Sequence, residues 1–174
     1  MIQRVFSFII LLALPLLATQ YNSTILELEA KIFPKIILLN EGISKDSKEL
    51  HIFIISKEID YNTAYKLKKL INYNYPDTLM GKKVCVDIKE FQEFQTLPDA
   101  LIVLYHCKKQ LTKIALWANT HNIISFAYDP SYMEYGILGS LYIGKSTKPY
   151  LNKNIIQKYN FTFNPYLLEL SKFK

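Results

Sequence analysis

Three residues with reactive or metal-binding side chains, His106, Cys107 and Lys108, directly follow the apolar run ALIVLY at 100–105. A thiol and an imidazole can form a nucleophile–base pair, bind a transition metal or take part in redox chemistry. Catalysis requires the imidazole within hydrogen-bonding reach of the sulfur, but adjacent residues of a strand point to opposite faces. We therefore expect no catalytic residue here and do not expect an enzyme.

The other histidines and the second cysteine give little support for a metal site or a disulfide. His51 begins one predicted strand and His121 precedes another, so parallel strands place both far from His106, and no CxxC or HExxH spacing is present. Along neighbouring parallel strands, Cys85 and Cys107 are offset by about 15 Å at 3.3 Å per residue, whereas a disulfide needs Cα atoms about 4.4 to 6.8 Å apart. We expect free thiols, with Cys85 buried, and neither metal nor cofactor. The open alternative is a disulfide, since exported chains with two cysteines usually join them.

Hydrophobic periodicity predicts the elements that position these residues. Short apolar runs alternate with helical patterns, which indicates parallel strands joined by right-handed helical crossovers. The expected fold is a three-layer α/β/α sandwich with a mostly parallel sheet of about five to six strands, then a C-terminal hairpin and two short helices. The predicted strands are ELHIFIISK, KKVCVDI, ALIVLYH and IISFAYD, and the predicted long helices cover 23–42, 61–74 and 108–122.

Two details of the helices are also predicted. Ser23 is expected to cap the first helix and Asp60 the second, because short polar side chains accept hydrogen bonds from free N–H groups at helix starts. The apolar stripe of the first helix is expected to consist of Ile25, Leu28, Ile32, Ile36 and Leu39, which recur every three or four residues.

Residues 1–20 have the features of a secretory signal peptide. A single Arg4 precedes the uncharged run VFSFIILLALPLL at 5–17, which is shorter than the roughly 20 residues that a membrane-spanning helix needs. We expect cleavage between about 18 and 21, export to the periplasm, and one α/β domain over 21–174. An uncleaved N-terminal anchor is the alternative.

The positive charge of the chain does not point to nucleic acid. The sequence has 21 Lys and Arg against 15 Asp and Glu, a formal net charge of +6, but Arg4 is its only arginine and lies in the predicted signal peptide. Sequence-specific DNA recognition depends on the planar, bidentate guanidinium of arginine. We expect no nucleic-acid binding and only a modest attraction to anionic surfaces.

Three stretches resemble the YfiR/HmsC-like family of periplasmic regulatory proteins: LEAKIFPKIILL, LPDALIVLYHC and the segment from YGILGSLYIG to the C-terminus. The family's glycine-containing strand, Asn-bearing strand, apolar link and terminal Leu-Leu helix correspond to Gly139, Asn152, 161–163 and Leu167 with Leu168. The Trp-Pro that often closes the family's first helix is absent. The resemblance implies a non-enzymatic protein that binds the periplasmic part of an inner-membrane diguanylate cyclase or histidine kinase and controls it, and so a role in cyclic-di-GMP signalling.

Two surfaces are candidate binding sites. The first interpretation of His106, Cys107 and Lys108 is that a buried strand reaches the surface there. In open α/β sheets, however, ligands gather at the carboxyl ends of the strands, so this rim is a candidate site for a small anion or metabolite. A protein partner is expected at the aromatic loop that follows the fourth strand, because Tyr and Met are favoured at interfaces; in the alternative, the loop caps the core. A periplasmic solute-binding module is the second candidate function, and a homodimer remains open. The expected ligand residues are Ser56, Lys57, His106, Lys108, Tyr128 and Asp129, and the expected partner residues are Tyr132, Met133 and Tyr135.

Overall fold

The computed structural model describes residues 21–174, so the predicted signal peptide at 1–20 lies outside the described residues. The strands are β1 (Glu49–Ile55), β2 (Lys83–Lys89), β3 (Ala100–Val103), β4 (Ile124–Ala127), β5 (Gly139–Ile143), β6 (Thr147–Leu151) and β7 (Lys172–Phe173). The α-helices are α1 (Ser23–Leu38), α2 (Tyr61–Asn74), α3 (Lys108–Thr120), α4 (Lys153–Tyr159) and α5 (Pro165–Leu170), and the 3-10 helices are η1 (Glu58–Asp60) and η2 (Pro130–Tyr135).

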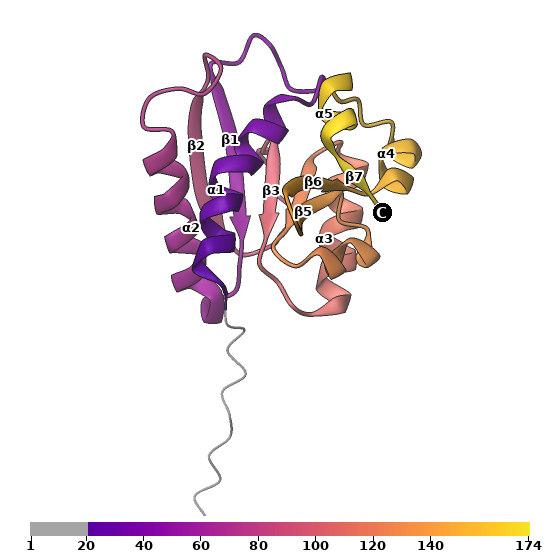
Figure 1. Cartoon of the computed structure of the whole chain (residues 1–174). Helices are drawn as coiled ribbons and strands as arrows, with labels where there is room; N and C mark the ends of the chain where they lie inside the picture. The colour runs from indigo at the N-terminus through magenta and orange to yellow at the C-terminus, as the bar shows by residue number, and fades with distance from the viewer. Residues whose placement is uncertain (1–20) are drawn as a thin grey trace, which may run out of the picture.

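Within residues 21–174 these strands form one sheet in the order β2-β1-β3-β4-β5-β6-β7. Figure 1 shows β2, β1 and β3 side by side. Strands β1 to β5 are mutually parallel, and β6 returns antiparallel to β5 as the predicted hairpin. The parallel pairing of the first and third apolar runs is confirmed, because Ile52 pairs with Ala100 and Ile55 with Val103. The two-residue β7 beside β6 was not predicted, since so short a strand leaves no periodic signal.

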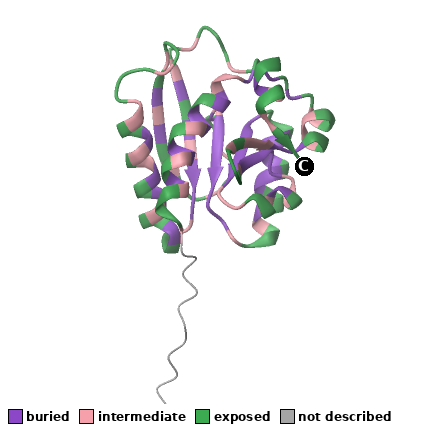
Figure 2. Cartoon of the chain, viewed as in Figure 1, coloured by how far each residue is buried: buried purple, intermediate pink, exposed green. Residues whose placement is uncertain are grey.

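Helices cover both faces of the sheet, which confirms the three-layer α/β/α fold. On one face, α1 and α2 pack on the alternate residues Leu50, Ile52 and Ile54 of β1. On the other face, α3 packs on Leu101 and Val103 of β3. Every residue of β3 and β4 is therefore buried, as the purple arrow of β3 shows in Figure 2, and this explains their continuous apolar sequences.

Several details differ from the prediction. Asn22, not Ser23, caps α1, because its side-chain oxygen accepts from the N–H groups of Thr24 and Ile25. Asp60 precedes α2 but makes no capping hydrogen bond with its side chain. The loop after β4 contains η2, which Asp129 caps through a hydrogen bond from the Ser131 N–H.

No helix described between residues 21 and 174 combines the length and the apolar character that crossing a bilayer demands.

Candidate functional site

Tyr21, the first described residue, lies at the carboxyl ends of β3 and β4, against Leu104, His106 and Tyr128. Its hydroxyl donates to the carbonyl oxygen of Leu104 at 2.9 Å and lies 2.7 Å from Nε2 of His106. The other ring nitrogen of His106, Nδ1, lies 2.6 Å from the Tyr132 hydroxyl. One neutral tautomer satisfies this geometry: Nε2–H donates to Tyr21, and Nδ1 accepts from Tyr132.

Asp60 is the buried acid of this cluster. Its Oδ1 lies 3.5 Å from His106 Nε2 and 3.4 Å from the Tyr21 hydroxyl, so the carboxylate faces the cluster rather than the N-terminus of α2. Burial, followed by the negative charge of Asp60, raises the pKa of Tyr21 far above its usual value. Burial and the charges of Asp129 and Asp60 raise the pKa of Tyr132 to about 12. Both hydroxyls therefore stay protonated at neutral pH.

This arrangement suits a structural role, in which the side chains hold the rim together, better than catalysis. A general base needs a free lone pair that can reach a substrate proton. Both nitrogens of His106 are instead engaged by tyrosine hydroxyls. Cys107 is exposed and precedes α3, and no described hydrogen bond joins its sulfur to His106.

The expected ligand residues divide into two groups. His106 and Tyr128 come together around Tyr21: the Tyr21 and Tyr128 rings meet edge to face at 4.8 Å, and the Tyr128 hydroxyl accepts from the Asn22 N–H at 2.7 Å. The others have separate structural positions. Ser56 is buried, Asp129 caps η2, Lys57 lies over the ring of Tyr105, and Lys108 lies over the ring of Tyr135.

The expected partner residues do not form an exposed surface. Met133 is fully buried, so its assignment to a partner surface is wrong. Tyr132 and Tyr135 are half-buried and pack against the core beneath α3. The short helix η2 turns this loop back over the end of the sheet, and its side chains cap the core.

A different surface near the rim is exposed and apolar. Ile59, Tyr61 and Tyr65, on η1 and the first turns of α2, are 70%, 52% and 46% exposed. We call these three residues the Ile59–Tyr65 patch. Ile59 and Tyr61 directly precede and follow Asp60, whose carboxylate lies against Tyr21 and His106, so the patch adjoins this part of the rim. Hydrophobic periodicity indicates the buried face of a helix, so it did not predict this exposed patch.

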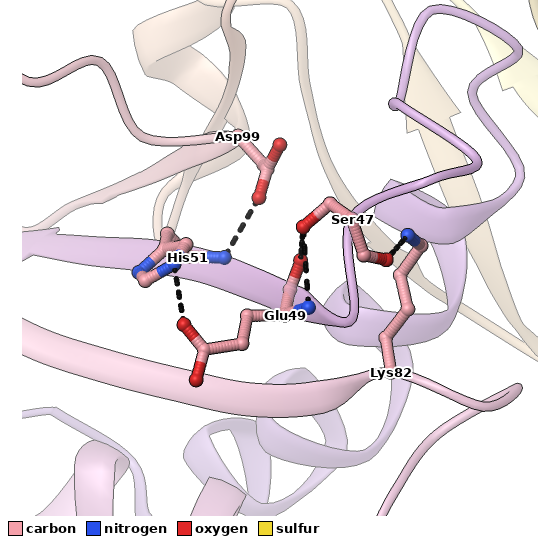
Figure 3. A network of polar contacts seen from close by, with 5 residues as sticks. All are labelled: Ser47, Glu49, His51, Lys82 and Asp99. Atoms are coloured by element: carbon pink, nitrogen blue, oxygen red, sulfur yellow. Dashed lines mark hydrogen bonds and ion pairs between the residues drawn. The ribbon is translucent and has the colours of Figure 1, made fainter.

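A second polar cluster lies where β1 and β2 begin, on the face of the sheet opposite α1. Nε2 of His51 lies 3.1 Å from Oε2 of Glu49, and both side chains are about half exposed (Figure 3). Cys85 is the register partner of His51 on β2. Cys85 is partly exposed rather than buried as predicted, and partial burial together with the charge of Glu49 raises the pKa of its thiol.

Comparison with known proteins establishes the fold alone. No protein-family model matches the sequence, and no curated protein matches it. Among solved structures, a conserved domain protein from Vibrio cholerae aligns over 86% of this chain with a TM-score of 0.54 and 13% identity. An ABC domain in complex with L-Trp from Streptococcus pneumonia aligns over 80% of this chain with a TM-score of 0.50 and 12% identity. This chain spans 60% of the length of each, and the likeness shows that it shares their α/β fold.

Proposed function

We propose that this chain is a non-enzymatic periplasmic regulatory protein that binds the periplasmic part of an inner-membrane signalling protein, a diguanylate cyclase or a histidine kinase. The observation that carries the proposal is the arrangement of side chains at the rim of the sheet. Tyr21 lies at the place where α/β proteins usually hold a small ligand, and the exposed Ile59–Tyr65 patch lies beside it. The resemblance to the YfiR/HmsC-like family supplies the class of partner.

The chemistry of the Ile59–Tyr65 patch suits a protein partner. The Tyr61 and Tyr65 rings stack with their centroids 6.4 Å apart, and the Lys69 ammonium lies 4.7 Å from the Tyr65 centroid. Tyrosine presents a large, rigid contact area with a polar tip and is enriched among residues that dominate binding energy. A neighbouring cation favours an acidic or aromatic surface on the partner.

Charge reversal within the patch tests this proposal. In the native host, tagged wild-type protein should retain an integral-membrane cyclase or kinase from detergent-solubilised membranes. We expect Tyr61→Glu combined with Tyr65→Glu to weaken that association at least about 10-fold. Two aromatic side chains that the partner covers in the complex would be replaced by unpaired charges. Tyr73→Glu is the matched control, since Tyr73 lies on the same helix and is also exposed.

The outcome is read in two ways. Quantitative mass spectrometry of the retained membrane proteins reports binding, and cellular cyclic-di-GMP or kinase output reports regulation. Retention of no cyclase or kinase by the wild type, or equal retention by the patch variant and Tyr73→Glu, contradicts the proposal.

A solute-binding module is the second candidate, and one observation favours it. A mainly apolar groove of about 440 Å³ adjoins the rim, lined by Ile25, Tyr128, Pro130, Leu141, Tyr142, Ile143 and Tyr150. The Streptococcus domain of similar fold is a complex with L-Trp. A true ligand at a hundred times its Kd adds about 2.7 kcal/mol to the free energy of unfolding. If the chain is a protein-binding regulator, its unfolding temperature should not change when L-Trp, other amino acids, nucleotides or inorganic anions are added. A clear rise in the unfolding temperature with one of them favours the solute-binding module.

A further inference from the structure

The cluster at the start of β1 combines three different metal-binding groups. Glu49 and His51 are alternate residues of β1 and point to the same face, and Cys85 lies directly across from His51 on β2. One carboxylate oxygen, one imidazole nitrogen and the thiol sulfur lie within 4.8 Å of one another. The convergence depends on the parallel register, in which Glu49 pairs with Lys83 and His51 with Cys85.

The spacing and chemistry of these groups fit a small tetrahedral cation. Zinc bonds of about 2.0 to 2.1 Å to nitrogen and oxygen place two ligands about 3.3 Å apart at a tetrahedral angle. The 3.1 Å between His51 Nε2 and Glu49 Oε2 is close to that edge. A thiolate selects zinc over magnesium or calcium, which prefer oxygen ligands alone. We propose that Glu49, His51 and Cys85 form a Zn²⁺ site with a fourth position open to water.

The backbone that carries two of the ligands is held in place by polar contacts (Figure 3). The His51 N–H donates to Oδ2 of Asp99 at 2.7 Å, and the Asp99 N–H donates to the His51 carbonyl at 2.9 Å. The Ser47 hydroxyl donates to the Glu49 carbonyl at 2.7 Å, and Lys82 donates to the Ser47 carbonyl. Such outer contacts orient the ligand-bearing strand before an ion arrives and reduce the reorganisation that binding requires.

The surroundings allow an ion to enter from solvent. Strand β2 is an edge of the sheet, and the side chains of Glu49 and His51 are about half exposed. Phe53, two residues beyond His51 on the same face, packs edge to face on Phe94 at 5.1 Å and supplies an apolar boundary. Because β1 and β2 begin at the end of the sheet opposite the rim, this site does not depend on the proposed function. A bound ion would cross-link the side chains of the edge strand β2 and its neighbour β1.

Zinc titration of untagged, exported protein tests the site. We expect one Zn²⁺ per chain in competition with a chromophoric chelator, and Co²⁺ should give the thiolate-to-metal charge-transfer band of a cysteine ligand. Cys85→Ser, His51→Gln and Glu49→Gln should each weaken Zn²⁺ binding by at least about 10- to 100-fold. Zinc should also raise the unfolding temperature of the wild type but not of Cys85→Ser.

Matched controls use the same residue types elsewhere in the chain. Cys107→Ser and His121→Gln, at exposed positions outside the cluster, should bind Zn²⁺ as the wild type does. Circular dichroism checks that each variant is folded, and Glu49→Gln serves as the test if Cys85→Ser fails to fold. Wild-type affinity in the cluster variants, or Co²⁺ binding without a thiolate band, overturns the proposal.

Discussion

Replacing Glu29 by leucine is expected to raise the free energy of unfolding at pH 7 by about 2 to 4 kcal/mol. The Glu29 side chain is fully buried on α1, and neither carboxyl oxygen has a hydrogen-bond partner. Burial raises the pKa of this carboxyl well above its usual value, so the folded state binds this proton more tightly than the unfolded chain does. Leucine is slightly larger, but it removes both the unpaired polar group and the free-energy cost of holding the carboxyl in the core.

The same residue should make stability depend on pH in a defined direction. Below about pH 4.3 Glu29 is protonated in both states and contributes no pH dependence. As the pH rises above that value, only the unfolded state loses the proton, so the stability of the wild type falls by up to about 1.36 kcal/mol per pH unit until the pH reaches the folded-state pKa. The Glu29→Leu variant should lack this component of the slope.

Urea unfolding between pH 5 and pH 8 measures both effects. Glu29→Gln separates charge from polarity, because it removes the titration but keeps an unpaired amide in the core. Glu27→Gln is the matched control, since Glu27 lies exposed on the same helix and its replacement should leave the midpoint nearly unchanged. A lower midpoint for Glu29→Leu, or a pH slope identical to that of the wild type, would show that Glu29 has a partner or water that the described contacts lack.

Glu29 also shows where sequence reasoning fails on α1. The predicted apolar stripe includes Ile25, Leu28 and Ile32, yet these are only partly buried. The helix instead buries a face that includes Ala30, Phe33 and Glu29. Apolar residues lie on most sides of this helix, so periodicity predicts that it is helical but does not determine which side faces the sheet.

The sheet was more predictable than the site, for a physical reason. Runs such as ALIV and ISFA must be covered on both faces whatever their neighbours are, so parallel strands follow from local sequence. The Tyr21–His106 contact joins residues 85 positions apart, and the pairing of His51 with Cys85 depends on the exact register of two strands. A shift of one residue would send Cys85 to the opposite face, so this cluster could not be found before the register was known.

The family resemblance includes residues whose positions explain the fold rather than a binding site. Asn152 caps α4, and its side-chain amide donates to the Met133 carbonyl at 3.1 Å, which ties the hairpin to η2. Phe161, Phe163 and Leu167 are buried in the core beneath α1. Gly139 forms the register pair with Phe126 that joins β5 to β4. These residues specify how the C-terminal third closes the sheet.

Gly139→Ala should therefore destabilise the protein by about 1 to 3 kcal/mol. An added Cβ would lie 2.7 Å from Cε1 of Phe126 and 3.1 Å from the Tyr150 carbonyl oxygen. The Phe126 ring stacks on Phe33 with centroids 4.5 Å apart, so it has little freedom to move aside. Urea unfolding measures the loss, and an unchanged midpoint would mean that the ring relaxes at no cost.

A double-mutant cycle identifies the cause of that loss. Phe126→Ala alone should cost about 3 to 5 kcal/mol by leaving a cavity, but the same cavity accepts the methyl group of Gly139→Ala. The double variant should therefore lose less stability than the sum of the single losses. Leu67→Ala is the control partner, because α2 packs on β1 and β2, away from β5 in the strand order, and its cycle with Gly139→Ala should be additive within about 0.5 kcal/mol. Additivity in the Phe126 cycle would instead place the strain at the Tyr150 carbonyl, on the hairpin rather than in the core.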